Sequence, residues 1–338
     1  RILIKNMLLM SKQQKIHYSP IESLTIYPLT FCFQAESYAE MPVFPIPLIR
    51  AAIGKTLQKL EQKDAIPILD GAPVSAYLFN NQMADNHPWH KEYQEPPRGF
   101  WLSSVAGNNN LFQPGDIFQI KCTFSGMYSR FTEVLVKVLK EAGVHGFGIK
   151  NAAFSLISVN SESAYGRQSI VWKATNPIEI NEITGVSIHD YHTCSLTGNE
   201  LKIHFKTATA LSKSHSIFGG IPFMELTELL AKRLTLLSNM YCASPFSWDK
   251  TYDRSEIRDI YVAESDLKWK IYSRISNRQH ATAPVEGYEG NVIYITGKSN
   301  QLRQFLPILL FGQHTHIGRN ITFGGGQYEI DHGSYRII

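Results

Sequence analysis

The chain has 338 residues, of which 43% are hydrophobic and 18% are charged. This length allows two domains, and the composition excludes a disordered polymer because enough apolar surface is present to build a core. The formal net charge of +4 permits nucleic-acid binding without requiring it, so a basic surface has to be found locally. No apolar run approaches the roughly 18 residues of a membrane span, and we expect no membrane partner.

The four cysteines, Cys32, Cys122, Cys194 and Cys242, are far apart in the sequence and form no metal-type pair. Cysteines without such a pattern are usually free thiols in a reducing compartment. We therefore expect a cytoplasmic protein with neither a metal site nor a cofactor.

The first half of the chain alternates between strand and helix patterns. In chain order, we expect a strand at 24–34, a helix at 47–60, a strand at 75–80, a strand at 117–124, a helix at 130–143 and a strand at 152–159.

The second half repeats this order. We expect a strand at 201–211, a helix at 222–241, strands at 267–279 and 291–297, a helix at 300–311 and a strand at 326–330. Strand, helix, two strands, helix and strand is the order of the ferredoxin-like split βαβ arrangement. The sequence thus predicts an α+β fold of two tandem ferredoxin-like (RRM-like) βαββαβ modules. We expect them at 19–165 and 166–338, the second with a glycine-rich loop. Patterns at 61–113 and 160–200 are too weak to interpret.

The predicted strand at 267–279 has side chains of two kinds, because neighbours on a strand point to opposite faces. Odd positions are mainly apolar and are expected in the core: Leu267, Trp269, Ile271, Ser273 and Ile275. Even positions carry four cations with a tyrosine and no acid: Lys268, Lys270, Tyr272, Arg274, Ser276 and Arg278, followed by His280. This pattern suits RNA phosphates and a stacked base. A solvated face, or an edge strand protected by lysines, is the alternative.

The stretch from Gly318 to Gly326 combines glycines with polar donors. Gly324, Gly325 and Gly326 are consecutive, and Arg319 and Asn320 follow Gly318. Bare amides can cradle phosphates, and the two side chains add donors. A tight turn would need fewer glycines. The stretch lacks the lysine and spacing of a nucleotide P-loop, so we expect RNA rather than ATP.

These motifs resemble a known family. "DLKW" at 266–269, "PILLFG" at 307–312 and "HIGRNITFGGGQY" at 316–328 are similar in order and spacing to the CRISPR-associated endoribonucleases of the RAMP superfamily (the Cas-six family). "PLIRAAIG" at 47–54 resembles the early helix of that family. The resemblance covers most of the chain and implies a tandem ferredoxin-like fold.

The resemblance also implies an activity. Such enzymes bind CRISPR repeat RNA and cleave precursor transcripts into mature CRISPR RNAs without a metal. The 2′-hydroxyl beside the scissile phosphate attacks it and leaves a 2′,3′-cyclic phosphate. The product RNA and other subunits of a CRISPR effector complex are the implied partners.

The acid and base of this reaction are less clear, because the early helix has no histidine where the family often has one. His316 lies inside the strongest motif and is the first candidate, with Lys55 and Arg50 as cationic candidates. His314 and His145 are weaker alternatives, and His314 with His316 is a poor metal pair. The missing histidine leaves a second hypothesis open, an RNA-binding subunit of a CRISPR ribonucleoprotein complex that has lost cleavage.

Overall fold

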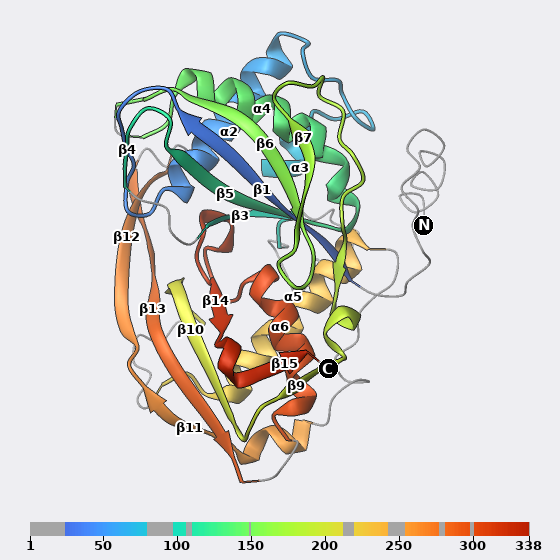
Figure 1. The fold of residues 1–338 in the computed structure, drawn as a ribbon, viewed down its shortest axis with the longest axis vertical. Coiled ribbons are helices and arrows are strands. Elements are labelled where there is room, and N and C mark those ends of the chain that lie inside the picture. Colours follow the sequence, from blue (N-terminus) through green and yellow to red (C-terminus); the bar gives the residue numbers. More distant parts are fainter. Residues whose placement is uncertain are drawn as a thin grey trace.

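The computed structural model describes residues 24–79, 97–105, 110–148, 150–211, 220–242, 254–276, 281–297 and 301–337. In the described residues, two large antiparallel sheets with their helices form the two modules, and two two-stranded sheets, Ala39–Glu40 with Leu111–Phe112 and Cys194–Leu196 with Tyr335–Ile337, accompany them (Figure 1).

The first module contains the following elements: β1 (Thr25–Ala35), β2 (Ala39–Glu40), α2 (Ile46–Gln62), α3 (Val74–Phe79), β3 (Phe100–Ser104), β4 (Leu111–Phe112), β5 (Ile117–Ser125), α4 (Thr132–His145), β6 (Phe154–Glu162), β7 (Gln168–Lys173) and β8 (Val186–Ser187). Its strands follow the order β3-β5-β1-β6-β7, and β8 pairs with the start of β1. The core order β6-β1-β5-β3 is that of a ferredoxin-like module.

The second module contains the following elements: β9 (Cys194–Leu196), β10 (Glu200–Thr209), α5 (Phe223–Tyr241), β11 (Ile260–Ser265), β12 (Lys268–Ser276), β13 (Ala281–Thr296), α6 (Leu306–Thr315), β14 (Tyr328–Ile330) and β15 (Tyr335–Ile337). Its sheet has the order β11-β13-β10-β14, and β12 pairs with the first half of β13. β9 and β15 pair apart from it. The predicted tandem ferredoxin-like fold is confirmed.

Three details differ from the sequence patterns. Residues 75–79 of the strand predicted at 75–80 lie in the helix α3, and residue 80 lies outside the described residues. β11 was not anticipated; it pairs with the second half of β13, which is longer than the strand expected there. β7 and β8 follow residue 166 in the sequence, but they pair with β6 and β1 of the first sheet. The division of the chain into domains at residue 166 stays a prediction.

The helices form where apolar residues recur on one face. Ile49, Ile53 and Leu57 of α2 are buried, and Pro47 stands in its first turn, where a missing amide donor costs nothing. β1 is buried on both faces along nearly its whole length. Helices cover one face of β1, so the second module has to cover the other.

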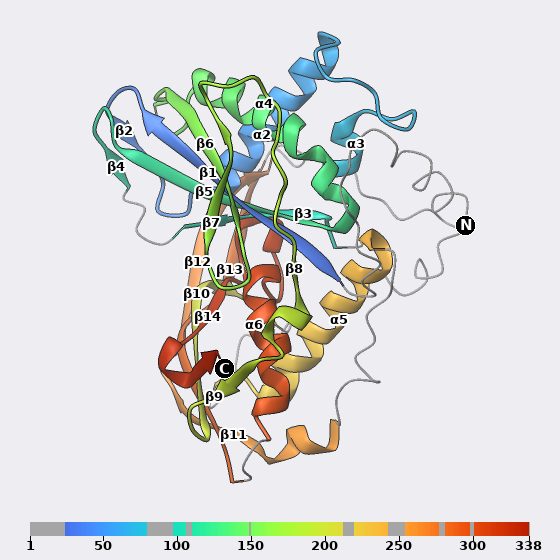
Figure 2. The same ribbon diagram turned by 45° about the vertical axis from the view of Figure 1, so that its right-hand side comes forward.

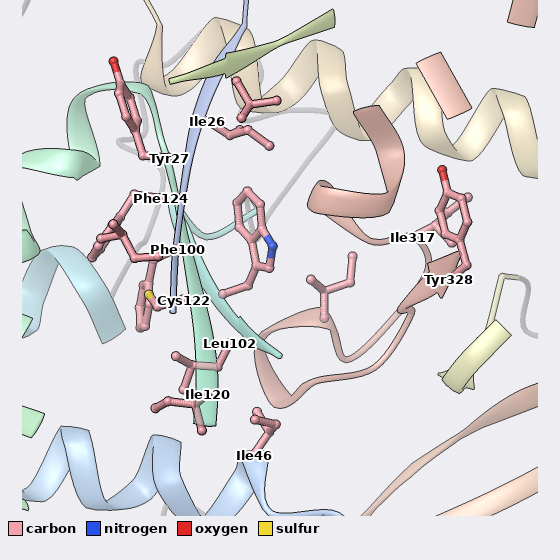
Figure 3. Packing of buried hydrophobic residues seen from close by; sticks show 14 of the residues in the cluster. Ile26, Tyr27, Ile46, Phe100, Leu102, Ile120, Cys122, Phe124, Ile317 and Tyr328 are labelled. Atoms are coloured by element: carbon pink, nitrogen blue, oxygen red, sulfur yellow. The ribbon is translucent and has the colours of Figure 1, made fainter. Parts of the chain in front are cut away.

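The second module reaches the open face of the first sheet through α5 and α6 (Figure 2). The Trp101 indole of β3 donates to the His314 carbonyl at the end of α6, at 2.9 Å. Arg233 of α5 lies 4.9 Å from the Trp101 ring and donates to the Thr315 carbonyl. In Figure 3, Phe100 of β3 lies on one side of the strands, and Ile317 lies on the other. One hydrophobic core therefore runs through both modules.

Candidate functional site

Three segments with predicted functional residues meet where the modules join. α2 supplies Arg50, β12 supplies Arg274, and the 3-10 turn η5 (Ile321–Phe323) of the glycine-rich loop supplies Phe323. The guanidinium carbon of Arg274 lies 3.9 Å from the centre of the Phe323 ring, and that of Arg50 lies 5.4 Å from it. We call Arg50, Arg274 and Phe323 the arginine cluster.

Arg50 is enclosed by aromatic rings. Its guanidinium carbon lies 4.7 Å from the centre of the Phe79 ring and 5.1 Å from that of Phe100, with Phe323 on a third side. The residue is 7% exposed, and its Nη1 atom is buried without a hydrogen-bond partner. Aromatic faces attract a cation, but they do not use its N–H donors.

The electrostatics of the cluster favour an anion. Burial lowers the pKa of Arg50 to about 9, and the positive charges of Arg98 and Arg274 contribute to the lowering. Burial also lowers the pKa of Arg274, whose Nε atom has no hydrogen-bond partner. A buried charge without a counter-ion costs several kcal/mol. An oxyanion placed between these guanidinium groups would recover much of that cost.

Arg130 has similar aromatic neighbours to Arg50 and also a carboxylate partner. It also lies over two rings, at 4.9 Å from Phe131 and 5.4 Å from Tyr77. Its Nη1 atom, however, donates to a carboxylate oxygen of Asp70 at 3.0 Å. Among the described residues, Arg130 pairs with a carboxylate and Arg50 does not.

The faces of β12 differ from the alternation expected. Ile271, expected in the core, is 63% exposed, and Ser273 is exposed as well. This part of β12 extends beyond the core of its own module, so its even-numbered face turns toward α2. Arg274 consequently packs on Phe323, while Lys268 and Lys270 are exposed. Arg278 lies outside the described residues.

Tyr272 contributes to the junction of the modules. Its ring stacks on Phe44, just before α2, with ring centres 4.6 Å apart and planes 17° apart. Its hydroxyl donates to Glu289 at 2.8 Å. Partial burial, with this hydrogen bond, raises the Tyr272 pKa to about 12. One face of the ring predicted to stack on a base is therefore covered by Phe44.

The glycine amides are occupied within the protein. The amides of Gly324, Gly325 and Gly326 donate to the carbonyls of Ile321, Asn320 and Ala208, respectively. They are not free to cradle a phosphate. RNA binding by Gly318 and by Gly324–Gly326 stays a prediction, and any contribution of Gly324–Gly326 cannot come from free amides.

Two glycines are needed for the path of the loop. Gly326 has φ 75°, and a Cβ there would collide with the Ile317 carbonyl. Gly324 has φ 91°, and a Cβ there would lie 2.9 Å from the Ile46 side chain at the start of α2. Both positions favour glycine sterically. The glycines let the loop fold back on itself and lie against α2.

Of the two histidines near the loop, His316 is buried and His314 is partly buried. His316 is 4% exposed, its Nδ1 atom has no partner, and burial holds its pKa well below the ordinary value. Burial lowers the pKa of His314 to about 3, and its Nε2 atom lies 2.7 Å from the Tyr191 hydroxyl. Both rings are neutral at pH 7. Proton transfer by His316 stays a prediction, and its burial against Trp101 favours a packing role.

The remaining predicted residues lie at the surface. Lys55 is exposed; five residues turn a helix by about 500°, so it leaves α2 on a different side from Arg50. Arg319 is exposed, and Asn320 has a left-handed backbone with φ 58°. His145 is half exposed, 3.8 Å from Glu141 on the same helix.

Sequence reasoning missed the aromatic part of the site. Phe323 lies within the glycine motif, but nothing in the sequence indicates a role for its side chain. Phe79 and Phe100 lie in the region 61–113, whose pattern was too weak to interpret, and so does Arg98. A possible signal was the juxtaposition of an arginine and aromatic residues in "RGFW" at 98–101.

Comparison with known proteins agrees with these observations. Residues 203–328 match the family model of the CRISPR-associated endoribonuclease Cas6, and residues 24–183 match a model of an N-terminal domain, AF_1859_N. Residues 203–328 therefore form a Cas6-family domain. No curated protein matches it by sequence.

Solved Cas6 structures share the fold. Thermus thermophilus Cas6 is 10% identical with a TM-score of 0.51, and the alignment covers 91% of this chain and 99% of that one. A Cas6 product complex gives 11% identity and a TM-score of 0.50, covering 92% and 100%. A chain of a partial Cas6-RT-Cas1–Cas2 complex is 13% identical with a TM-score of 0.55, and the alignment covers 92% of this chain and 46% of that longer chain. These likenesses show the tandem ferredoxin-like fold.

Two features are absent from the described ranges. None of their helices is long and apolar enough to cross a membrane. The same ranges hold no group of three or more His, Cys, Asp and Glu side chains placed to bind a metal ion.

Proposed function

We propose that this chain is an endoribonuclease that binds CRISPR repeat RNA and cuts precursor transcripts into mature CRISPR RNAs. The observation that carries the proposal is the arginine cluster. Two guanidinium groups have buried nitrogens without partners, at a junction built from α2, β12 and the glycine-rich loop. A phosphodiester of RNA supplies the missing negative charge.

The reaction is metal-independent in this proposal, because the nucleophile belongs to the RNA. The 2′-oxygen forms a bond to phosphorus while the bond from phosphorus to the 5′-oxygen breaks. The 2′-hydroxyl proton goes to a base, and the leaving 5′-oxygen takes a proton from an acid. The products are a 2′,3′-cyclic phosphate and a 5′-hydroxyl. Negative charge builds up on the phosphoryl oxygens in the transition state, and fixed cations at that point stabilise it.

Arg50 suits this electrostatic role. Its charge is held in place by Phe79, Phe100 and Phe323, so little reorganisation is needed as the reaction proceeds. Arg274 is less buried and approaches from β12. Together they neutralise one phosphate from two modules, and substrate binding and module packing are thereby linked.

A second function has specific support. The described groups around Arg50 are Phe79, Phe100, Phe323, Arg98, Cys122 and Arg274, without a histidine among them. The lowered pKa values of His314 and His316 leave both rings neutral at pH 7. An RNA-binding subunit that holds the repeat without cutting it needs the phosphate site and no proton transfer. This is the alternative to the enzyme.

We further propose that the protein keeps its product RNA and associates with other subunits of a CRISPR complex. The matched Cas6-RT-Cas1–Cas2 chain is longer than this one, which shows the fold as part of a larger polypeptide. The free thiols of Cys32, Cys122, Cys194 and Cys242 fit a reducing cytoplasm, where we place the protein.

The test is a single-turnover cleavage assay in EDTA. Repeat RNA is compared with the same RNA carrying one 2′-deoxy nucleotide at the cut position. The enzyme proposal expects cleavage of the first and none of the second, with a cyclic phosphate end. Tight binding without cleavage of either RNA across pH 5 to 9 would favour the binding subunit. Cleavage of the 2′-deoxy RNA would refute the mechanism.

A further inference from the structure

The glycine-rich loop places one aromatic ring, that of Phe323, beside α2. The turn η5 ends at Phe323, and left-handed residues flank it on both sides, Asn320 at φ 58° and Gly324 at φ 91°. Gly324 lies against Ile46 of α2. The loop is thus fixed to the helix that carries Arg50. Its three consecutive amides donate within the protein, so a contribution of Gly324–Gly326 to an RNA site is the path that they give the loop and its side chains.

We propose that Phe323 is a positioning residue, which holds Arg50 and Arg274 so that both address one RNA phosphate. The inference rests on the proposed function in one respect, that an RNA phosphate binds at the arginine cluster. It assigns the loop the task of mounting an aromatic ring between two cations. Phe323 touches the guanidinium groups and does not have to touch the RNA.

The distances support this arrangement. Arg274 lies over the Phe323 ring at 3.9 Å, which is close contact, and Arg50 lies at 5.4 Å from the same centre. Both are within the roughly 6 Å at which a ring attracts a cation. Without the ring, two like charges in a partly buried site would repel each other, and the more exposed Arg274 would turn toward solvent.

The ring leaves the donors of both arginines available. Arg50 Nη1 and Arg274 Nε are buried and have no hydrogen-bond partner. A ring face attracts a guanidinium group without accepting a conventional hydrogen bond from its N–H groups. A carboxylate in the position of Phe323 would also hold the arginines together, but it would neutralise them. An aromatic ring positions the charges and preserves them for a phosphate.

The test separates the ring's electron cloud from its volume. Phe323→Leu keeps an apolar side chain of moderate size and removes the aromatic face. Phe323→Tyr keeps the aromatic face. Melting temperature and the salt dependence of RNA affinity are measured for both variants. The RNA is the repeat, with a single 2′-deoxy nucleotide at the cut position if the wild type cuts, and unmodified if it does not.

The proposal expects Phe323→Leu to weaken RNA binding by about 3- to 30-fold, the effect of a cation–π contact in a partly desolvated site. The log–log salt slope should fall by about 0.7, one phosphate contact. Phe323→Tyr should stay within about 3-fold of the wild type. Equal losses in both variants that follow the melting temperature would show a packing role and overturn the proposal. Wild-type affinity and slope in Phe323→Leu would overturn it too.

A double-mutant cycle completes the test. In the Arg274→Gln background, Phe323→Leu should cause less than about 2-fold further loss, because the ring acts through the arginine. Full additivity would refute the coupling. All of these readouts are binding measurements. Failure of the wild type to cut would therefore refute the enzyme proposal and leave the test of Phe323 intact.

Discussion

Replacing Arg50 by methionine should separate stability from function. The lowering of the Arg50 pKa to about 9 corresponds to a bias of about 5 kcal/mol against the charged form in the folded protein. Three aromatic contacts offset much of this cost, at about 0.5–2 kcal/mol each. Methionine is unbranched and apolar, and it fills much of the same space. We expect the free energy of unfolding to stay within about 1 kcal/mol of wild type, or to rise.

The same variant should lose function. Removing one fixed cation from a charged transition state costs about 10²–10³-fold in rate. We therefore expect Arg50→Met to slow single-turnover cleavage by that factor at saturating protein, and to lower the salt slope of RNA binding by about 0.7. Urea unfolding and cleavage are measured on the same preparation.

Arg130→Met is the matched control. Arg130 has similar aromatic surroundings, but it pairs with Asp70, and both side chains are partly exposed. Losing this pair should destabilise the protein by up to about 1 kcal/mol and leave cleavage unchanged. If Arg50→Met lowers the free energy of unfolding by more than about 3 kcal/mol, or if the variant cuts RNA at the wild-type rate, Arg50 is a structural residue and does not stabilise the transition state.

Three further results are expected. His316→Ala should lower the melting temperature while the rate at saturating protein stays within about 10-fold; a loss of 10²–10⁴-fold in the folded variant would identify a proton-transfer group instead. The pKa values of His314 and His316 are lowered in the folded protein, so only the unfolded chain binds protons at these histidines as pH falls from 7 to 5. The free energy of unfolding, measured with urea, should therefore fall by about 2 kcal/mol per histidine over this range. Glutamine variants should abolish this dependence on pH. Gly325→Val should destabilise the fold by about 1–3 kcal/mol, because a Cβ at this position would lie 3.0 Å from the carbonyl oxygens of Ala208 and Arg319. The folded fraction should keep its RNA affinity. Lost affinity at an unchanged melting temperature would contradict this expectation.

Local periodicity was sufficient to predict the ferredoxin-like modules. The apolar stripe of α2 and the alternation along β5 are properties of single elements, and each is visible in a short window of sequence. β11 and α3 were harder, because a short segment buries too few residues for its period to be distinguished. Their form is decided by neighbours such as β13.

The faces of β12 show a second limit. Alternation correctly separated Tyr272 and Arg274 from Ile271, but it could not tell which side would be covered. Hydrophobicity suggested that Ile271 is in the core. The first module approaches from the other side, and a contact between modules leaves no period in the sequence of either strand.

The sequence selected several residues that lie together in the structure, while their roles in catalysis and RNA binding stay predictions. Arg50, Arg274 and the glycine-rich loop were selected from the sequence, and the structure brings them together. The burial of His316 was not predictable, since a histidine in a loop motif is usually accessible. It is buried because Trp101, more than 200 residues earlier in the chain, packs against it from the first module.

The most direct test of the arginine cluster is a scan in which each phosphate of the repeat RNA is replaced in turn by a neutral methylphosphonate. Binding is measured to wild-type protein and to Arg50→Met. Our account predicts one linkage whose neutralisation weakens binding to the wild type but not to Arg50→Met, and that this linkage is the one that is cut. If every neutral linkage affects the two proteins equally, Arg50 does not hold a phosphate and the central claim is wrong.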